Sequence, residues 1–452
     1  MKKLLKVGCS ALVLATLVAG CGSKGGDDGK KEVPTNADGK RILKFDAFSG
    51  GNGEEVWKDM KEAFEKANSD VVVELRFEQD LPAVLNKENA SGTYSDVVYY
   101  NLGQATAFTE TQLNSGEVLD ISDVMKEVSG NLDTQYVDAV AQYFGDGKSY
   151  VAPIMYTPAG LYYNTELIGE GKKYAMPTTW DDMFALGDKA KENGTTLFTY
   201  PVKGYFDMTI MGMLYQAGNE EYFTNALKYA EGTWDSENGK KITDTIAKLV
   251  DKKNGYLYAD TVANANVDKG FTKNQQAMID GKALFMPNGS WIVNEMKETT
   301  PKDFHWGVMP LPAFEKDGQR VVSTFTEQVW VPAKAANPDD AKAFIKFLYS
   351  EEGAKIFAKY NVVSPVKGSQ DLIEDQQLKD LFSVYKDETV KPVIGNYAAY
   401  DATKLPDLDF KKTMYGPIDD IASGKDGATA EKWNSELVEL WKTVAANPIA
   451  TK

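Results

Sequence analysis

The chain contains few residues of the types that enzymes use as nucleophiles or metal ligands. Its 452 residues include one histidine, His305, and two cysteines, Cys9 and Cys21. With a single histidine and no cysteine beyond position 21, Ser-His-Asp and Cys-His catalytic groups and histidine-rich metal sites are excluded. The sequence also lacks the G-x-x-x-x-G-K-[ST] pattern of a phosphate loop. We therefore expect no metal, no cofactor and no nucleophilic catalysis.

Carboxylates are the class of side chain that catalysis could still use. The chain has 66 Asp and Glu residues, and a glycosidase needs two carboxyl groups about 5 to 10 Å apart. No motif selects one pair, so solvated surface carboxylates are the default interpretation. A cell-surface glycoside hydrolase or lyase remains an alternative on this basis.

Aromatic residues stand beside amide, hydroxyl and carboxylate side chains where the sequence predicts loops. The aromatic residues are Tyr99, Tyr100, Tyr156, Tyr205, Phe206, Trp291, Tyr397 and Tyr400, and the polar residues include Asn101, Asn288, Glu327 and Gln328. One face of a sugar ring consists of C–H groups that pack on an aromatic plane, and the hydroxyls need polar partners once they lose water. The combination favours a carbohydrate ligand, although each aromatic residue alone is more typical of a core.

The N-terminus has the pattern of a secretory signal. Lys2, Lys3 and Lys6 precede a largely apolar run over residues 7–20, which is too short for a membrane-spanning helix. The run ends in Leu-Val-Ala-Gly-Cys at Cys21, which resembles the bacterial lipobox, whose cysteine receives a diacylglycerol. We expect residues 1–20 to be removed and lipidated Cys21 to anchor a secreted protein to the outer face of the cell membrane.

The segment after the anchor and the charge of the chain limit the partners further. Residues 21–40 are rich in Gly, Asp and Lys and lack aromatic residues, which predicts a flexible tether. The formal net charge is -16, and arginine occurs only at Arg41, Arg76 and Arg320. No basic surface for a phosphate backbone is indicated, so nucleic acid is not an expected partner.

Three apolar segments and one amphipathic segment predict the start of an α/β sheet. Residues 41–48, 71–77 and 96–100 have the pattern of strands, and residues 54–67 have apolar side chains at helical spacing. The alternation of strand and helix predicts a parallel sheet, which binds ligands beyond the carboxyl ends of its strands.

The remaining sequence predicts a second lobe and several helix boundaries. Residues 161–298 contain helical patterns broken by Gly and Asn, and a strand from Ala283 is followed by a helix that opens with Trp291. Later segments predict a short strand at 329–331, a helix beginning at Pro338, another beginning after Ser350 and a last helix over 430–446.

Read in order, these segments resemble the extracellular solute-binding proteins (family 1) of carbohydrate ABC importers, the family that includes maltose-binding protein. The motifs are "KFDAFSGGNGEEVWKDMKEAFEKAN", "SDVVYYNLG", "YVAPIMYTPAGLYYNTEL", "PTTWDDMFAL", "FTKNQQAMIDGKALFMPNGSWIVNEM", "WGVMPLP" and "VWVPAKAANPDDAKAFIKFLYSEEGAKIF". The likeness covers almost all of the mature chain. The first two motifs look most like members that bind N-acetylglucosamine-type or other oligosaccharides.

The resemblance implies a fold and its division into parts. The expected fold is α/β, with two periplasmic-binding-protein-like lobes (type II) that are discontinuous in sequence and joined by crossing hinge strands. The expected first lobe consists of residues 41–153 plus 329–378. The expected second lobe consists of residues 154–328 plus 379–452.

The resemblance also implies a set of ligand contacts, in which Trp291 stacks on a sugar ring. The residues that match the family's contact positions, together with Tyr397 as a candidate near the C-terminus, are Ser49, Gly50, Gly51, Tyr100, Asn101, Tyr156, Thr157, Tyr205, Phe206, Asn288, Gly289, Ser290, Trp291, Glu327 and Tyr397. Tyr156 and Thr157 stand where maltose-binding protein has a glutamate, and Lys203 stands where an acidic residue is expected. These departures argue against a maltodextrin.

The resemblance thus implies a monomeric, lipid-anchored receptor that captures a mono- or oligosaccharide and delivers it to the permease of an ABC importer. No enzymatic activity is expected. A glycoside hydrolase or lyase, and a binding protein of the same fold for a polyol, peptide or polyamine, are the alternatives.

Overall fold

The computed structural model describes residues 33–447, except for residues 50–52, 105–106, 396 and 398–407. The predicted signal peptide, the predicted lipidation site Cys21, and the residues Gly50, Gly51 and Tyr400 lie outside the described residues.

The first strands form the expected parallel unit. Strand β1 (Arg41–Phe48) pairs in parallel with β2 (Val71–Glu78) and with β3 (Val97–Tyr99). Helix α1 (Glu55–Ala67) connects β1 to β2, and its buried residues Val56, Trp57, Met60 and Phe64 recur at the spacing of one helix face. The predictions for this part of the chain are confirmed.

The rest of the sheet is mixed, so the predicted parallel pairing holds for the first three strands but not for the whole sheet. Strand β8 (Arg320–Trp330) pairs antiparallel with both β3 and the long β4 (Val151–Asn164). The other strands are β5 (Thr196–Phe198), β6 (Ala283–Asn288), β7 (Trp306–Met309) and β9 (Val390–Val393). The strand order is β2-β1-β3-β8-β4-β6-β5, with β7 beside β4 and β9 beside β8. The predicted short strand at 329–331 is therefore the end of an 11-residue strand.

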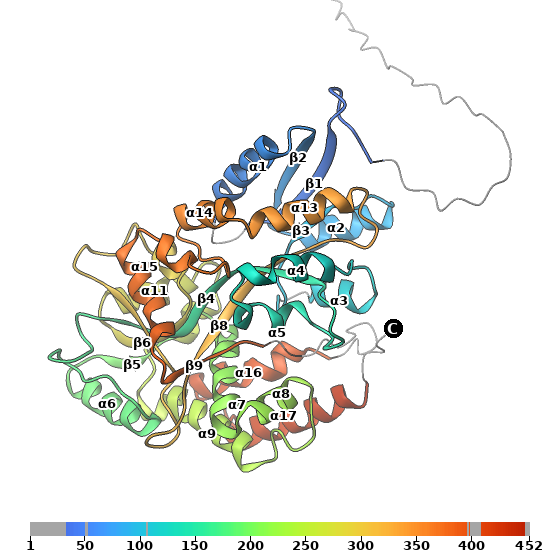
Figure 1. Ribbon diagram of the computed structural model, residues 1–452. Coiled ribbons are helices and arrows are strands. Elements are labelled where there is room, and N and C mark those ends of the chain that lie inside the picture. Colours follow the sequence, from blue (N-terminus) through green and yellow to red (C-terminus); the bar gives the residue numbers. More distant parts are fainter. Residues whose placement is uncertain (1–32, 50–52, 105–106, 396, 398–407, 448–452) are drawn as a thin grey trace, which may run out of the picture. The chain divides into compact units, whose positions relative to one another are not determined.

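The remaining α-helices surround this sheet (Figure 1). They are α2 (Leu81–Ala90), α3 (Phe108–Asn114), α4 (Ser122–Val128), α5 (Asp138–Ala141), α6 (Trp180–Glu192), α7 (Phe206–Gly218), α8 (Glu220–Leu227), α9 (Glu237–Val250), α10 (Thr261–Ala265), α11 (Phe271–Ile279), α12 (Ile292–Glu295), α13 (Pro338–Leu348), α14 (Glu351–Lys359), α15 (Gln376–Phe382), α16 (Phe410–Ser423) and α17 (Ala430–Ala445).

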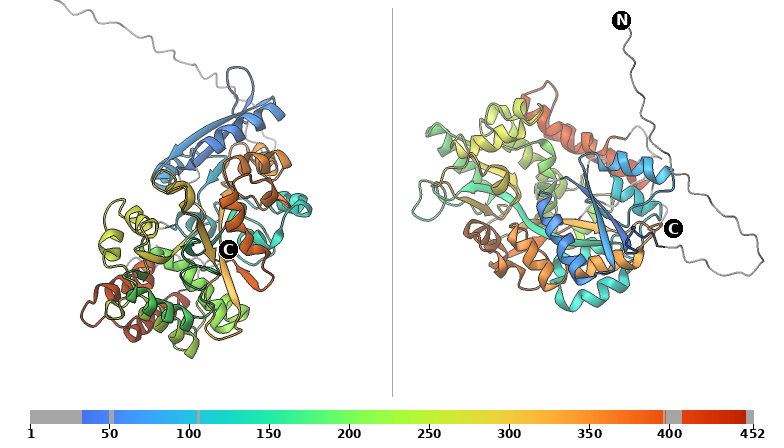
Figure 2. Two further views of the ribbon diagram at one scale, coloured as in Figure 1. Left: turned by 90° about the vertical axis from the view of Figure 1, so that its left-hand side faces the viewer. Right: turned by 90° about the horizontal axis from the view of Figure 1, so that it is seen from above.

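Two large hydrophobic clusters hold these elements together. The first core includes Phe45, Trp57 and Phe344, from β1, α1 and α13. The second core includes Phe206 and Trp441, and in it α17 packs beside α9 although the two helices are far apart in sequence (Figures 1 and 2). Burial of each large apolar side chain contributes about 1.5–3 kcal/mol to the stability of the fold. Each of the two cores therefore stabilises the elements that pack in it.

The crossing strands β4 and β8 belong to both cores. Strand β4 places Ile154 in the first core and Leu161 in the second, and β8 does the same with Val329 and Val321. The side chains between these points stand at the junction of the two cores, where the candidate site lies.

Helices α13, α14 and α17 begin where their capping residues predict. Asn337 accepts a hydrogen bond from the Asp340 N–H at the start of α13, and Ser350 accepts one from the Gly353 N–H at the start of α14. Helix α17 begins after Thr429 and ends one residue before the predicted end. Capping of otherwise unpaired N–H groups explains why these boundaries can be read from sequence.

The end of the predicted tether is structured. The Ile42 N–H donates to the Pro34 carbonyl at 2.8 Å, and the Lys40 N–H donates to the Asn36 side chain at 3.0 Å. Residues 33–40 therefore form a turn against β1, and the predicted tether from 21 to 40 is too long. Within the described residues, no helix combines the length and the apolar content needed to cross a lipid bilayer.

Candidate ligand-binding site

Strands β4 and β8 place polar and aromatic side chains at the junction of the two cores. Their antiparallel register sets Met155 opposite Glu327 and Thr157 opposite Phe325. Since side chains alternate along a strand, Phe325 and Glu327 lie on the same face of β8. Both are half-buried, whereas the intervening Thr326 is buried.

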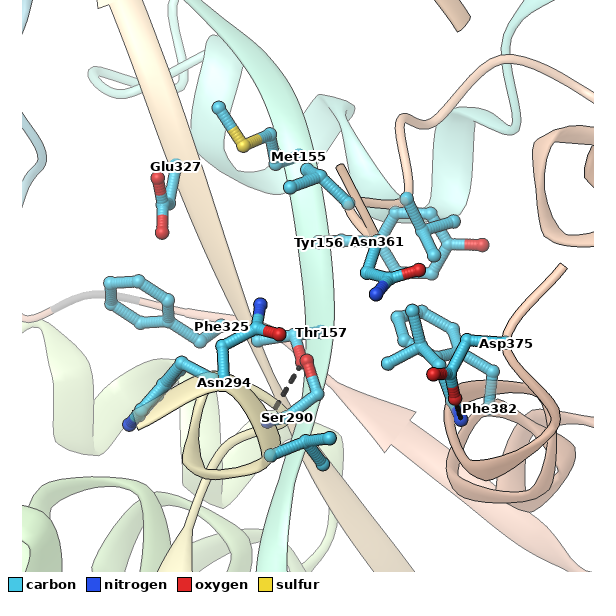
Figure 3. Close-up of a pocket in the computed structure, with 15 residues that line it drawn as sticks. Met155, Tyr156, Thr157, Ser290, Asn294, Phe325, Glu327, Asn361, Asp375 and Phe382 are labelled. Carbon is cyan, nitrogen blue, oxygen red and sulfur yellow. Dashed lines mark hydrogen bonds between the residues drawn. The ribbon is translucent and has the colours of Figure 1, made fainter. Parts of the chain in front are cut away.

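The connection from β6 to α12 brings Trp291 to the same place. A Cβ atom on Gly289 would lie 2.1 Å from the Trp291 ring, so only glycine lets the indole lie across this backbone. The Ser290 N–H donates to the Thr157 hydroxyl at 3.3 Å, and the two hydroxyls are also hydrogen-bonded (Figure 3). These contacts fix the loop that carries Trp291 to strand β4.

A cavity opens between these strands, α12, α15 and the segment that follows α14. Its empty volume is about 510 Å³, including space open to solvent at its mouth. We call it the Trp291 pocket; it is lined by Met155, Tyr156, Thr157, Ser290, Trp291, Val293, Asn294, Phe325, Glu327, Asn361, Val362, Val363, Asp375, Leu378 and Phe382 (Figure 3).

Three aromatic rings from separate elements meet at one side of this pocket. Trp291 and Phe325 have ring centroids 5.7 Å apart at 76°, and Tyr205 and Trp291 have centroids 6.3 Å apart at 65°. All three rings are half-buried. They keep surface that a ligand can cover, and edge-to-face contacts hold them in position.

The charged groups in the pocket lining are acidic. Glu327 accepts a hydrogen bond from the Tyr99 hydroxyl, and Asp375 accepts one from the Leu378 N–H at 3.0 Å as the N-cap of α15. No lysine or arginine is among the described residues that line the pocket. The lining therefore suits ligands that donate hydrogen bonds and disfavours anions.

The two tyrosines nearest the pocket remain protonated. Burial raises the pKa of the Tyr205 phenol, and the nearby Glu295 carboxylate raises it further, while a hydrogen bond with Trp291 opposes the shift. Burial also raises the pKa of Tyr156. Tyr156 stacks on Tyr136 with centroids 4.0 Å apart, and its oxygen accepts a hydrogen bond from Gln370 at 2.6 Å. Tyr156 thus closes the pocket mainly by packing.

The structure brings part of the predicted site together. Tyr156, Thr157, Ser290, Trp291 and Glu327 all line the Trp291 pocket. Tyr205 touches Trp291 from outside the lining, and Gly289 lies beneath the indole. Their contact with a ligand remains a prediction.

Two other predicted contacts lie inside the second core or beside it. Phe206 is fully buried, with its ring against Phe198 and Tyr200. Tyr397 packs on Phe410 with ring centroids 5.3 Å apart. In this structure neither residue is part of the Trp291 pocket.

The remaining predicted residues have local structural partners. Asn288 is fully buried, and Tyr100 packs against Phe48 with ring centroids 5.8 Å apart. The Asn101 side chain accepts from the Gln328 N–H at 2.9 Å, and the Ser49 hydroxyl donates to Glu54 at 3.3 Å. These four residues also lie outside the lining of the Trp291 pocket.

Several lining residues are missing from the sequence-based set. Phe325 could have been found, because it stands two positions before Glu327 on a strand and so shares its face. Asn294, Asn361, Asp375 and Phe382 come from segments whose approach to β4 depends on the tertiary fold. No local pattern in the sequence indicates them.

Comparison with known proteins agrees with this architecture. Residues 59–382 match the family model described as bacterial extracellular solute-binding protein. The chain belongs to this family. Among relatives of this solute-binding protein, the diacetylchitobiose binding protein NgcE of Streptomyces coelicolor is 26% identical over 47% of this chain and 45% of its own length. The multiple sugar-binding protein of Streptococcus mutans is 24% identical over 81% of this chain and 83% of its own length.

A solved structure extends the likeness to the fold of almost the whole chain. The maltose-bound MalE3 of T. maritima superposes with a TM-score of 0.66 at 17% identity, over 89% of this chain and 99% of that protein. The solute-binding protein therefore has the two-lobe periplasmic-binding-protein-like fold. Its relatives are named as binding proteins, and it is a binding protein and not an enzyme.

Proposed function

We propose that this protein captures a neutral sugar in the Trp291 pocket and delivers it to the permease of an ABC importer. One observation carries the proposal: a half-buried tryptophan stands beside Phe325 in a pocket whose charged lining groups, in the described part of the chain, are carboxylates. Relatives named for diacetylchitobiose and for multiple sugars support the same ligand class.

The lining fits the two surfaces of a sugar ring. Trp291 and Phe325 offer apolar faces for the C–H groups, and Glu327 offers a strong acceptor for hydroxyl groups. A uronate or sugar phosphate would place its negative charge near Glu327 and Asp375 without a lining cation to compensate. The favoured ligand is therefore uncharged.

Closure of the lobes follows from the position of the pocket. We assign residues 41–153 plus 329–378 to the first lobe and residues 154–328 plus 379–452 to the second. The pocket is lined by the crossing strands, by α12, which lies in the proposed second lobe, and by Asn361, Val362 and Val363, which follow α14 in the proposed first lobe. A ligand that contacts both lobes binds the closed form more tightly and shifts the population toward it.

Transport requires that the receptor remain near the permease. The pattern at Cys21 resembles a lipobox, and a diacylglycerol there would hold the protein at the outer face of the membrane. One relative, from Streptococcus pneumoniae, is itself named a maltooligosaccharide solute-binding lipoprotein. The receptor acts as a monomer, with the sugar and the permease as its partners.

The proposal is tested by removing the tryptophan ring. Candidate sugars are first screened by thermal shift, because a ligand that binds only the folded form raises the melting temperature. Isothermal titration with the best sugar should then show that Trp291→Ala weakens binding about 5- to 30-fold, since central aromatic contacts contribute about 1–2 kcal/mol.

Trp291→Phe is the matched control, because it keeps an aromatic face at the same position. It should retain most of the affinity, and both variants should keep the melting temperature of the unliganded protein. Unchanged binding by Trp291→Ala, or a best ligand that carries a carboxylate or phosphate, would overturn the proposed site.

A further inference from the structure

Tyr205 reaches Trp291 from a short connection between β5 and α7. The connection ends in the 3₁₀ helix η3 (Lys203–Tyr205), in which the Tyr205 N–H donates to the Val202 carbonyl at 3.0 Å. A 3₁₀ helix has poorer hydrogen-bond geometry than an α-helix and is stable only in short pieces. The direction of the Tyr205 ring therefore depends on contacts that hold η3 from outside.

One carboxylate, that of Asp419 on α16, holds this connection at two points. Its Oδ1 atom accepts a hydrogen bond from the Tyr200 hydroxyl at 2.8 Å, and its Oδ2 atom accepts one from the Lys203 ammonium at 2.8 Å. Asn266, which follows α10, donates to the same Oδ2 atom at 3.0 Å. Asp419 thus fixes residues 200 and 203 to α16.

The surroundings of Asp419 make these contacts strong. The Asp419 side chain is 11% exposed and that of Lys203 is 37% exposed. A hydrogen bond to an ionised group is about twice as strong as one between neutral groups. Burial raises the pKa of Tyr200, and the Asp419 carboxylate raises it further. The Tyr200 phenol therefore stays protonated and continues to donate to Asp419.

The connection has a second support, which acts at its start. The Asn274 side chain donates to the Tyr200 carbonyl at 2.8 Å and to the Thr261 carbonyl at 3.0 Å. The Lys203–Asp419 ion pair acts closer to the aromatic ring, because Lys203 stands two residues before Tyr205 in η3. Loss of Asp419 would therefore loosen the connection at the end that carries the ring.

The same ion pair accounts for the lysine at position 203, where the family resemblance leads us to expect an acidic residue. The Lys203 ammonium lies against Asp419, and Lys203 is not in the lining of the Trp291 pocket. Its positive charge is therefore compensated within the second lobe and does not have to be met by a ligand.

We propose that Asp419 is a positioning residue for the sugar site, which holds η3 so that the Tyr205 ring stays against Trp291. Asp419 does not line the Trp291 pocket, so it acts through Lys203 and Tyr205 and not by touching the sugar. Support of this kind keeps a binding side chain in one direction. This inference rests on the proposed function, and it adds a residue that controls the site from behind.

A double-mutant cycle tests the proposal. The probe is the sugar with the largest thermal shift in a panel that includes N-acetylglucosamine, diacetylchitobiose, maltose and maltotriose, and calorimetry gives its dissociation constant. Tyr205→Ala should weaken binding about 5- to 30-fold, as loss of a central aromatic contact does. Asp419→Ala should weaken it at least about threefold, but no more than Tyr205→Ala. In Tyr205→Ala protein, adding Asp419→Ala should change the constant less than about twofold, because the ring is already absent.

Two further variants separate positioning from general stability. Asp420→Ala is the matched control, because Asp420 is the next residue of α16, pairs with Lys425 and has a side chain 44% exposed; it should bind as the wild type does. Lys203→Met should lose about as much affinity as Asp419→Ala, whereas Lys203→Arg keeps a cation for Asp419 and should bind within about twofold of wild type. A purely structural role would lower the melting temperature of these variants and leave the affinity of the folded protein unchanged.

The inference and the proposed function fail differently. If no sugar of the panel raises the melting temperature or gives heat of binding, the proposed function itself is wrong. If the sugar binds wild type but Asp419→Ala or Tyr205→Ala leaves its affinity unchanged, the inference is overturned and the proposed function stands. An equal loss from Asp419→Ala with and without Tyr205 also overturns it. Should Asp419→Ala not fold, Asp419→Asn replaces it in the cycle, since it keeps the shape and removes the charge that holds Lys203.

Discussion

Glu327 is the charged side chain that strand β8 contributes to the Trp291 pocket, close to its aromatic rings. It stands two residues after Phe325, and its register partner is Met155 of the neighbouring strand (Figure 3). The Tyr99 hydroxyl already donates to it, which orients the carboxylate. Since a carboxylate has about four acceptor positions, Glu327 can accept sugar hydroxyls in addition to Tyr99.

Glu327→Gln should weaken binding of the best sugar about 5- to 10-fold. The substitution keeps the shape of the side chain but replaces a charge-assisted hydrogen bond with a neutral one, a difference of about 1 kcal/mol or more. Titration calorimetry measures the change. Glu315→Gln is the control, because that glutamate has a side chain 79% exposed and should bind as the wild type does. Equal affinities of Glu327→Gln and wild type would remove Glu327 from the site.

Trp291 and Phe206 show how far single residues can be interpreted from sequence. Both were predicted to contact a ligand, but Trp291 is half-buried beside a cavity whereas Phe206 is fully buried. Trp291 follows Gly289 in a loop, and that glycine leaves room for the indole. Phe206 begins a helix whose first turn faces the second core. The side of an element that a residue faces depends on partners distant in sequence.

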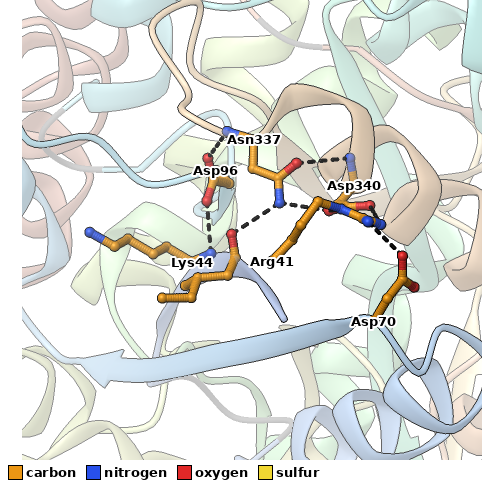
Figure 4. Close-up of polar contacts among 7 residues, drawn as sticks. Arg41, Lys44, Asp70, Asp96, Asn337 and Asp340 are labelled. Carbon is orange, nitrogen blue, oxygen red and sulfur yellow. Dashed lines mark hydrogen bonds and ion pairs between the residues drawn. The ribbon is translucent and has the colours of Figure 1, made fainter. Parts of the chain in front are cut away.

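At the scale of elements, the start of α13 joins that helix to the first strand. Asn337 caps α13 and also donates from its side chain to the Ile42 carbonyl at 3.0 Å and to Asp340 at 2.7 Å (Figure 4). Its own N–H donates to Asp96 at 2.7 Å. Arg41 pairs with Asp340 and Asp70, and these contacts raise the pKa of the guanidinium. One polar cluster thus ties α13 to β1.

Asn337→Ala should lower the free energy of unfolding of the first lobe by about 2–3 kcal/mol. The variant loses an N-cap, which contributes about 1 kcal/mol, and leaves the carbonyl of half-buried Ile42 without its side-chain donor. Denaturant unfolding measures the loss. Ser350→Ala removes the cap of α14 together with the hydrogen bond that the Ser350 hydroxyl donates to the Phe347 carbonyl, and it should cost about 1 kcal/mol. If the two variants lost the same stability, the contact with β1 would contribute nothing.

The starts of helices are easier to predict from the sequence than the crossing strands are. Asn337, Ser350 and Thr429 lie next to the N–H groups that they cap, so the signal is local. Strand β8 was predicted only at its apolar end, because polar Thr324, Thr326 and Gln328 interrupt the pattern. In the structure these residues are buried and hydrogen-bonded. Thr324 bonds to Tyr385, which is distant in sequence, and Thr326 and Gln328 bond to each other within β8, so no apolar strand pattern reveals them.

At the scale of the whole molecule, the proposed function requires attachment to the outer face of the membrane as well as the fold. The family is extracellular, and Cys21 lies outside the described residues. Two acyl chains bind a bilayer stably, since each buried CH₂ contributes about 0.8 kcal/mol. The sequence therefore predicts a lipid anchor, and this prediction has to be tested by experiments in cells.

Cys21→Ser should release the protein from the membrane. In cells fed with radiolabelled palmitate, wild-type protein should carry label and sediment with membranes, whereas the variant should carry none, because serine has no thiol to receive the lipid. Cys9→Ser alters the other cysteine of the chain, inside the predicted signal peptide, and should keep the label. Label on Cys21→Ser protein, or none on wild type, would show that the anchor is absent.

The central claim is that a sugar lies in one site between the two lobes, against Trp291. Crystallisation of the protein with the oligosaccharide that gives the largest thermal shift tests it most directly. We predict electron density for a sugar ring whose C–H face lies on the indole of Trp291, with a hydroxyl on Glu327. Density for the sugar elsewhere, with the Trp291 pocket filled only by water or closed by protein, would contradict the account.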